Sequence, residues 1–174
     1  FLQIQKCLLD FLLEIFLEHS LLYLHCLLCC MPSFMKDKLN PFHLAIPVSN
    51  LDESVIYYRD ILGLEEGRSS NKWADFNFFG HQLVCHVSDS INEKITNPVD
   101  GENVPVPHFG VVLSIEEFEE FLLKIDKKDI DFIIEPTVRF KGEIGEQRTM
   151  FFRDPSGNAI EIKAFKDIEN LFSS

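Results

Sequence analysis

Residues 154–161 have the sequence Asp-Pro-Ser-Gly-Asn-Ala-Ile-Glu, and the fold of the second half of the chain follows from it. Asp-Pro-Ser-Gly is typical of a tight turn, because proline fixes its φ angle and glycine tolerates a positive one. The segments on either side, Gln147–Arg153 and Asn158–Phe165, therefore predict two strands joined by that turn. In the second strand the apolar residues alternate onto one face, so Glu161 and Lys163 point to the other.

The segment upstream completes one structural unit. His108–Leu113 is an apolar run that predicts a strand. Ser114 and Glu117 form a capping box, which opens a helix extending to about Lys128. A further strand is predicted over Asp131–Phe140. The predicted order is therefore one strand, one helix and three strands.

The first half of the chain repeats this order. Pro41–Val48 alternates as a strand does, and Asn50 caps a helix that ends at Gly63. Three strand-like segments follow, at 65–69, 73–79 and 82–88. The polar interval 89–107 is rich in Asn, Asp, Gly and Pro, so we interpret it as a connector between two units.

We therefore predict an α+β fold made of two modules, residues 41–89 and 105–166, followed by a tail at 167–174. A module with one helix leaves one face of its sheet uncovered. Two modules are expected to pack together and to bury a shared cleft.

Four side chains occupy corresponding positions in this scheme. His43 and His108 stand at the start of the first strand of each module, and His86 and Glu161 stand in the last strands. Two imidazoles and a carboxylate suit Fe(II), Mn(II), Ni(II) or Zn(II) and leave coordination positions open. Taken singly, each His is more often a hydrogen-bonded core or rim residue, and Gln82 competes with His86 because both share a strand face.

Three basic residues surround a glycine-containing loop between the predicted strands of the second module. Arg139, Lys141 and Arg148 are predicted to bind an anionic substrate if that loop closes over it. The alternative is an ordinary solvated hairpin in which Glu143 and Glu146 balance the charge.

The overall charge limits the partners. The chain has 28 acidic and 16 basic residues and a formal net charge of −12, which opposes binding to nucleic acid or to anionic lipid. Beyond residue 40 the sequence holds one cysteine, Cys85, so no internal disulfide forms there. These features favour a reducing, cytoplasmic compartment.

Residues 1–34 differ in composition from the rest. They are rich in Leu and contain four cysteines, but Asp10, Glu14 and Glu18 interrupt the apolar run that a membrane span needs. We interpret them as an apolar, helical leader that does not belong to the folded domain and that the native protein lacks if it starts at Met31 or Met35. Membrane attachment through this leader is the alternative.

Four motifs carry a resemblance to a known family. They are Phe-His-Leu-Ala-Ile-Pro-Val at 42–48, Tyr-Tyr-Arg-Asp-Ile-Leu-Gly-Leu at 57–64, Pro-His-Phe-Gly-Val at 107–111, and the stretch at 154–161. Together they resemble the vicinal oxygen chelate superfamily, which contains glyoxalase I, extradiol dioxygenases, and fosfomycin and bleomycin resistance proteins. The resemblance implies paired βαβββ modules, a cupped sheet and a divalent metal, with Fe²⁺ or Mn²⁺ favoured over Ni²⁺ or Zn²⁺.

Carried onto this sequence, the resemblance assigns the metal ligands to His43, His108 and Glu161, with His86 beside them as the catalytic acid or base. It implies an enzyme acting on a small molecule with neighbouring oxygens. We expect a dioxygenase-like activity first, a glyoxalase-like lyase or isomerase second, and a metal-free binding protein of the bleomycin-resistance type third. Relatives in this superfamily often form homodimers, so a dimer is expected.

Overall fold

The computed structural model describes residues 39–89, 95–125, 128 and 130–172. The chain divides into two compact units, residues 1–40 and 41–174. The helical leader predicted over 1–34 lies outside the described residues. Within the described ranges, no helix is both long and apolar enough to cross a membrane.

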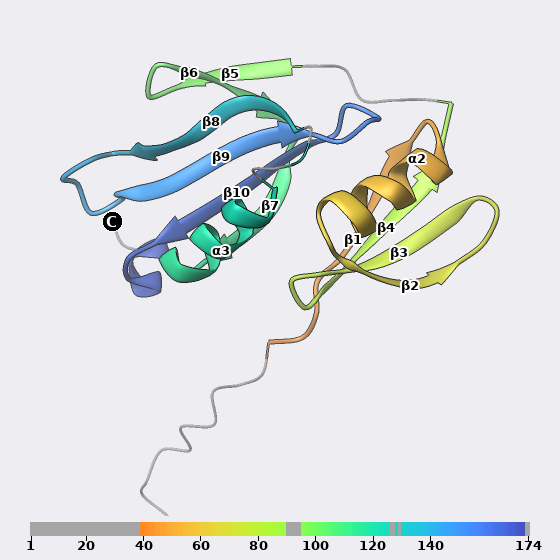
Figure 1. The fold of residues 1–174 in the computed structure, drawn as a ribbon. Coiled ribbons are helices and arrows are strands. Elements are labelled where there is room, and N and C mark those ends of the chain that lie inside the picture. The colour runs from red at the N-terminus through yellow and green to blue at the C-terminus, as the bar shows by residue number, and fades with distance from the viewer. Residues whose placement is uncertain (1–38, 90–94, 126–127, 129, 173–174) are drawn as a thin grey trace, which may run out of the picture. The chain divides into compact units, whose positions relative to one another are not determined.

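The first module follows the predicted order (Figure 1). Its elements are β1 (His43–Val48), α2 (Leu51–Val55) with a π-helical continuation (Ile56–Ile61), β2 (Glu65–Ser69), β3 (Trp73–Phe78) and β4 (His81–Val87). The strands form one sheet in the order β1-β4-β3-β2, with β1 parallel to β4. Asn50 caps the helix as predicted, because its side-chain oxygen accepts a hydrogen bond from the Glu53 N–H at 3.3 Å.

The second module has the same topology. Its elements are β7 (Phe109–Leu113), α3 (Ile115–Ile125), β8 (Asp131–Arg139), β9 (Gln147–Arg153) and β10 (Ala159–Phe165). The sheet order is β7-β10-β9-β8, and β7 runs parallel to β10. The capping box is confirmed: the Ser114 N–H donates to Glu117 Oε2 at 2.8 Å, and the Glu117 N–H donates to Ser114 Oγ at 3.2 Å. A short 3₁₀ helix, Ile168–Phe172, follows β10.

The α+β class and the two βαβββ modules are thus confirmed. The interval 89–107 connects the modules, but the regular structure within it was not predicted from the sequence. It contains a hairpin, β5 (Ile95–Val99) and β6 (Glu102–Val106). Asp100 and Gly101 form its two-residue turn and both have positive φ angles, 49° and 78°. Asp-Gly is a strong hairpin signal, which the polar and proline-rich composition of the segment masked.

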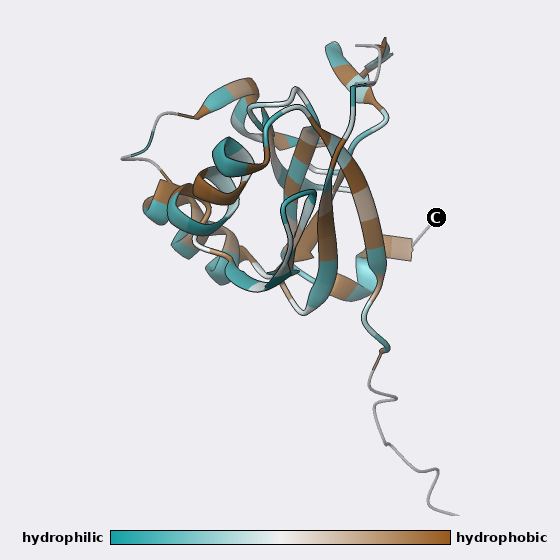
Figure 2. Ribbon diagram, turned by 90° about the vertical axis from the view of Figure 1, so that its right-hand side faces the viewer, coloured by the Kyte–Doolittle hydropathy of each residue, from teal (hydrophilic) through white to brown (hydrophobic). Residues whose placement is uncertain are grey.

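One hydrophobic core serves both modules. It combines residues from α2, β3 and β4 of the first module with residues from α3, β9 and β10 of the second. Figure 2 shows the apolar residues along the strands, while each helix carries both apolar and polar positions. The remaining face of each sheet is the one that its own helix leaves uncovered, and His43 and Glu161 lie on these faces.

The turn at 154–157 joins the two modules. The carboxylate of Asp154 is buried and accepts hydrogen bonds from the Tyr58 hydroxyl at 2.9 Å, from the Asn158 amide at 2.8 Å, and from the backbone N–H groups of Ser156 and Asn158. The Asn158 amide also donates to the Pro47 carbonyl at 2.9 Å. The turn therefore links the helix and first strand of one module to the last strand of the other.

We expect Asp154→Asn to lower the free energy of unfolding by roughly 2–3 kcal/mol, because an amide nitrogen cannot replace an oxygen that accepts hydrogen bonds in a buried site. Urea denaturation of the metal-free protein measures this. Tyr58→Phe removes one of the donors and should cost less, about 1 kcal/mol. Asp89→Asn, at an exposed position, is the control and should change stability by no more than about 0.5 kcal/mol. Equal effects for Asp154→Asn and Asp89→Asn would contradict the linking role.

Candidate metal centre

His108 and Glu161 form a close pair on the second module. His108 directly precedes β7, and Glu161 lies in the neighbouring parallel strand β10. The Nε2 atom of His108 is 3.4 Å from Oε2 of Glu161. Gly110 makes this proximity feasible, because a Cβ atom at that position would overlap the backbone carbonyl of Glu161.

The environment of Glu161 keeps its carboxylate charged although the residue is only 5% exposed. Thr149 on β9 donates its hydroxyl to Oε1 at 2.9 Å, and the Lys163 ammonium is 3.1 Å from Oε2. Burial by itself raises the pKa of Glu161, but the contacts with His108, Lys163 and Thr149 outweigh it and hold that pKa below its usual value. Glu161 in turn raises the pKa of His108, because its carboxylate accepts a hydrogen bond from Nε2 of the protonated ring.

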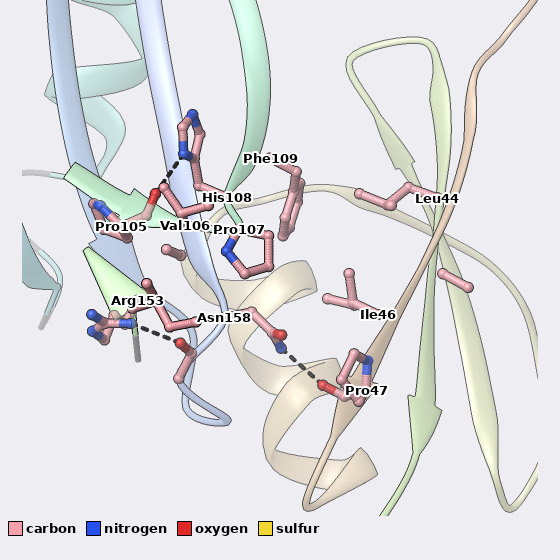
Figure 3. A pocket seen from close by; sticks show the side chains of 14 residues that line it. Leu44, Ile46, Pro47, Pro105, Val106, Pro107, His108, Phe109, Arg153 and Asn158 are labelled. Atoms are coloured by element: carbon pink, nitrogen blue, oxygen red, sulfur yellow. Dashed lines mark hydrogen bonds between the residues drawn. The ribbon is translucent and has the colours of Figure 1, made fainter. Parts of the chain in front are cut away.

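The other ring nitrogen of His108 is held by the backbone. Nδ1 lies 2.7 Å from the carbonyl oxygen of Pro105, so it carries the proton and donates it there (Figure 3). The neutral ring therefore presents the lone pair of Nε2 toward Glu161. A fixed Nδ1–H of this kind is the usual support of a metal-binding histidine.

His43 has a similar arrangement on the first module. It is exposed, and its Nδ1 lies 2.8 Å from the side-chain oxygen of Gln82 on β4. The Gln82 amide donates to Asp75 on β3 at 2.8 Å. Nε2 of His43 is therefore the ring nitrogen that remains available to coordinate a metal ion.

The structure does not bring all the predicted ligands together within one chain. Among the residues that it describes, no group of three or more His, Cys, Asp or Glu side chains is close enough to hold a metal ion. His108 and Glu161 are paired, while His43 contacts Gln82 on its own sheet. Among the described residues, the four side chains at corresponding positions therefore do not form one cluster, and the modules pack through a core on the helix-covered sides of their sheets.

The pairing of the strands also corrects the position of His86. If His43 corresponds to His108, then Ala45 corresponds to Gly110, and their neighbours Val84 and Glu161 correspond to each other. His86 is two residues further along β4 and is exposed. The sequence pattern gave the correct face of the strand but not its register, since alternation repeats every two residues.

The three basic residues of the predicted anion site have different surroundings. Arg139 is buried and donates to the Val99 carbonyl at 2.7 Å, which ties β8 to the β5–β6 hairpin. Arg148 forms an ion pair with Glu119 on α3 and lies over the Phe118 ring. Lys141 is exposed in the turn after β8.

Sequence reasoning did not assign functional roles to Thr149, Lys163 or Arg153. Thr149 and Lys163 pair directly across β9 and β10, so the antiparallel register would have placed both near Glu161. Arg153 is half-buried and helps to line a cavity of about 240 Å³ that also contains His108 (Figure 3). The cavity is mostly apolar and lies between the ends of β1 and β7, which are the edge strands of their sheets.

Comparisons with known proteins place this fold in a family. The model of the glyoxalase/bleomycin resistance protein/dioxygenase superfamily matches residues 40–162. The chain belongs to this superfamily. The family predicted from the sequence motifs is therefore confirmed.

Two relatives and two solved structures illustrate the similarity to this superfamily. The metallothiol transferases FosB of Staphylococcus epidermidis and of Staphylococcus haemolyticus are 28% and 27% identical, each over 69% of this chain and 79% of their own. A superfamily protein from Alicyclobacillus acidocaldarius has a TM-score of 0.68 and 32% identity, covering 79% of this chain and 100% of its own. The fosfomycin resistance protein FosX of Listeria monocytogenes has the same fold, with a TM-score of 0.56 and 22% identity over 74% of this chain and 93% of its own.

The contact between His108 and Glu161 predicts how the pKa of His108 changes when a neighbouring charge is removed. Glu161→Gln should lower the pKa of His108, because it removes the negative charge of the carboxylate that accepts from the protonated ring. Lys163→Met should raise the pKa of His108, because the ammonium opposes a second positive charge. NMR titration of the His108 ring in the metal-free protein measures both, and shifts of the same sign in the two variants would contradict the arrangement.

The pKa shifts of His108 and Glu161 determine the pH range in which their contact stabilises the fold. The raised pKa of His108 gives stability that is lost as the pH rises through that pKa, and the lowered pKa of Glu161 gives stability that is lost as the pH falls through it. The difference in unfolding free energy between wild type and Glu161→Gln should therefore be largest between about pH 4.5 and 6.5. Chemical denaturation across pH 4–9 tests this, and a difference that is independent of pH would contradict it.

Proposed function

We propose that this protein is a divalent-metal-dependent enzyme that activates a small, anionic, oxygen-bearing substrate for attack by an external nucleophile, a thiol in the first instance. The observation that carries the proposal is the pair of His108 and Glu161, in which the backbone holds Nδ1 of the imidazole and Nε2 faces a buried carboxylate.

The donor chemistry fits a metal ion. His43 and His108 each have Nδ1 bound to an oxygen acceptor and Nε2 free for coordination, and Glu161 supplies an anionic oxygen. Imidazole nitrogen together with carboxylate oxygen suits Mn²⁺, Fe²⁺ or Zn²⁺. A metal held by these three residues supplies Lewis-acid activation of the substrate's oxygen atoms.

The surrounding side chains favour an anionic substrate. Lys163 lies beside Glu161, and Arg153 lines the cavity next to His108, in a chain whose overall charge is −12. A positive charge at this point attracts a phosphonate, phosphate or carboxylate toward the proposed metal. Of the three basic residues predicted to bind an anion, Lys141 is exposed in the β8–β9 turn, while Arg139 and Arg148 contact Val99 and Glu119.

The residues around the proposed metal favour nucleophilic addition over ring cleavage and over isomerisation. The dioxygenase expectation rested on His86 standing next to the metal, and the register moves His86 two residues away. Val84 occupies the position that corresponds to Glu161, and an apolar side chain supplies neither a metal ligand nor a base. The curated relatives are named metallothiol transferases, which supports an external thiol as the nucleophile.

We further propose that His43 completes the metal site of a second copy of the chain. His43 is exposed on a sheet face that its own helix does not cover, and the His108–Glu161 pair lacks a third ligand within the described residues. A twofold dimer supplies the missing ligand twice, because each copy gives one His43 and receives one.

Binding of Mn²⁺ tests the metal site directly. Wild type should bind close to one Mn²⁺ per chain, and the variants His108→Ala, Glu161→Gln and His43→Ala should each lose at least tenfold in affinity, since each lacks one ligand. Isothermal titration with purified metal-free protein measures this. His86→Ala is the matched control and should bind as wild type does. Unchanged binding in His108→Ala would contradict the assignment.

Mixing two defective variants tests the shared site. His43→Ala and His108→Ala chains, unfolded and refolded together, should recover about a quarter of the wild-type metal sites, because half of the dimers are mixed and each mixed dimer has one intact site. Each variant refolded alone should recover none. If every ligand came from one chain, the mixture would also recover none, and the shared site would be refuted.

Turnover tests the reaction. Fosfomycin is the first substrate to examine, because similar structures include fosfomycin resistance proteins, one of them in complex with Mn(II) and 1S,2S-dihydroxypropylphosphonic acid. Phosphorus NMR should show a Mn²⁺-dependent product with added cysteine or glutathione and not with Glu161→Gln. If a product forms without any added thiol, water is the nucleophile and the reaction is hydration instead of thiol transfer.

A metal-free binding protein is the second candidate. It is favoured by one observation: the Lys163 ammonium already lies 3.1 Å from the Glu161 oxygen that faces His108. A permanent ion pair at that oxygen would satisfy the carboxylate without a metal. Failure of the wild-type chain to bind Mn²⁺, Fe²⁺, Ni²⁺ or Zn²⁺ would establish this candidate over the enzyme.

A further inference from the structure

Asp75 is a buried carboxylate whose hydrogen bonds are only partly satisfied. It lies in β3 between Ala74 and Phe76, and it is only 6% exposed. Its Oδ1 atom is buried and has no hydrogen-bond partner among the described residues, and its Oδ2 accepts from the Gln82 amide at 2.8 Å. A guanidinium nitrogen of Arg68 lies 3.6 Å from Oδ2 of Asp75, on a side chain that is 81% exposed. A buried carboxylate with one unpaired oxygen costs stability.

The register of the sheet connects Asp75 to His43. Gln82 on β4 pairs with His43 on β1 and with Asn77 on β3, two residues from Asp75. Asp75, Gln82 and His43 therefore share the uncovered face of the sheet. Gly67 on β2 leaves room for the carboxylate, because a Cβ atom there would overlap Asp75 Oδ1.

The carboxylate fixes the direction of the two hydrogen bonds. The Gln82 amide nitrogen donates to a carboxylate oxygen of Asp75, so the amide oxygen of Gln82 faces His43. That oxygen in turn only accepts, so Nδ1 of a neutral His43 must carry the proton. Nε2 of His43 is then left without hydrogen and with its lone pair exposed.

We propose that Asp75 and Gln82 are positioning residues that hold His43 in the tautomer needed for metal coordination through Nε2. This inference rests on the proposed function, which makes His43 a ligand. The second module reaches the same state by a different route, because the Pro105 carbonyl accepts from Nδ1 of His108. The first module lacks such a backbone acceptor for His43, and the buried Asp75 takes over that task through Gln82.

Two substitutions separate this role from a structural one. Gln82→Met removes the oxygen that accepts from His43 at similar side-chain length. Asp75→Asn keeps the shape but removes the directional constraint, because an amide either accepts from Gln82 or donates to it. Arg68→Gln is the matched control, since it alters the exposed partner of Asp75 and leaves the path to His43 intact. Thermal melts establish that each variant is folded.

The first readout needs no metal. Nitrogen-15 NMR of the histidine rings, recorded where the imidazoles are neutral, should show the Nδ1–H tautomer for His43 in wild type and in Arg68→Gln. Asp75→Asn should give a mixture of tautomers, and Gln82→Met should give mainly Nε2–H. His43 in the Nε2–H form in wild type, or an unchanged tautomer in Gln82→Met and Asp75→Asn, would overturn the proposal whatever the metal affinity.

The second readout is the affinity for Mn²⁺. Gln82→Met and Asp75→Asn should weaken it by about tenfold, the effect typical of lost support to a ligand, while Arg68→Gln should leave it unchanged. Wild-type affinity in both variants, with altered tautomers, would overturn the positioning role. If the proposed metal site itself is wrong, the wild-type chain will not bind Mn²⁺. That result is distinct from wild-type affinity in the two variants.

Discussion

The buried carboxylate of Asp154 is the contact on which the arrangement of the two modules depends. It accepts hydrogen bonds from Tyr58 in the first module and from Asn158 in its own turn, and Asn158 also binds the Pro47 carbonyl of β1. This turn opens β10, the strand that carries Glu161. The residues that dock the modules therefore also set the position of the proposed metal ligand, which gives a physical reason for the compact Asp-Pro-Ser-Gly-Asn-x-x-Glu pattern.

Much of the fold could be predicted because each module is encoded locally. The capping residues Asn50 and Ser114 and the turn at Asp154–Gly157 are short-range signals, and all three form the predicted structure. The β5–β6 hairpin was missed although Asp100-Gly101 signals it, since prolines and polar residues dominate that segment. Its burial against Ile134 and Phe151 depends on tertiary contacts that no local pattern contains.

The candidate site was predictable only in part. Glu161 follows from strand alternation, and its pairing with His108 follows from the parallel register of β7 and β10. The offset of His86 and the support from Thr149, Lys163 and Asp75 depend on the register of neighbouring strands, which the sequence alone leaves open. The contact of His43 with Gln82 of its own sheet, and not with the His108–Glu161 pair, depends on how the modules pack. The two histidines share one feature: in each, Nδ1 is hydrogen-bonded to an oxygen and Nε2 remains available for coordination.

The most direct test of the account is anomalous diffraction from crystals of the full chain grown with Mn²⁺. The account predicts one strong manganese peak per chain, coordinated by His108 Nε2 and Glu161 of one copy and by His43 Nε2 of another. A peak bound by other residues, or a crystal without any manganese peak and with the Lys163–Glu161 ion pair intact, would contradict the proposed metal centre.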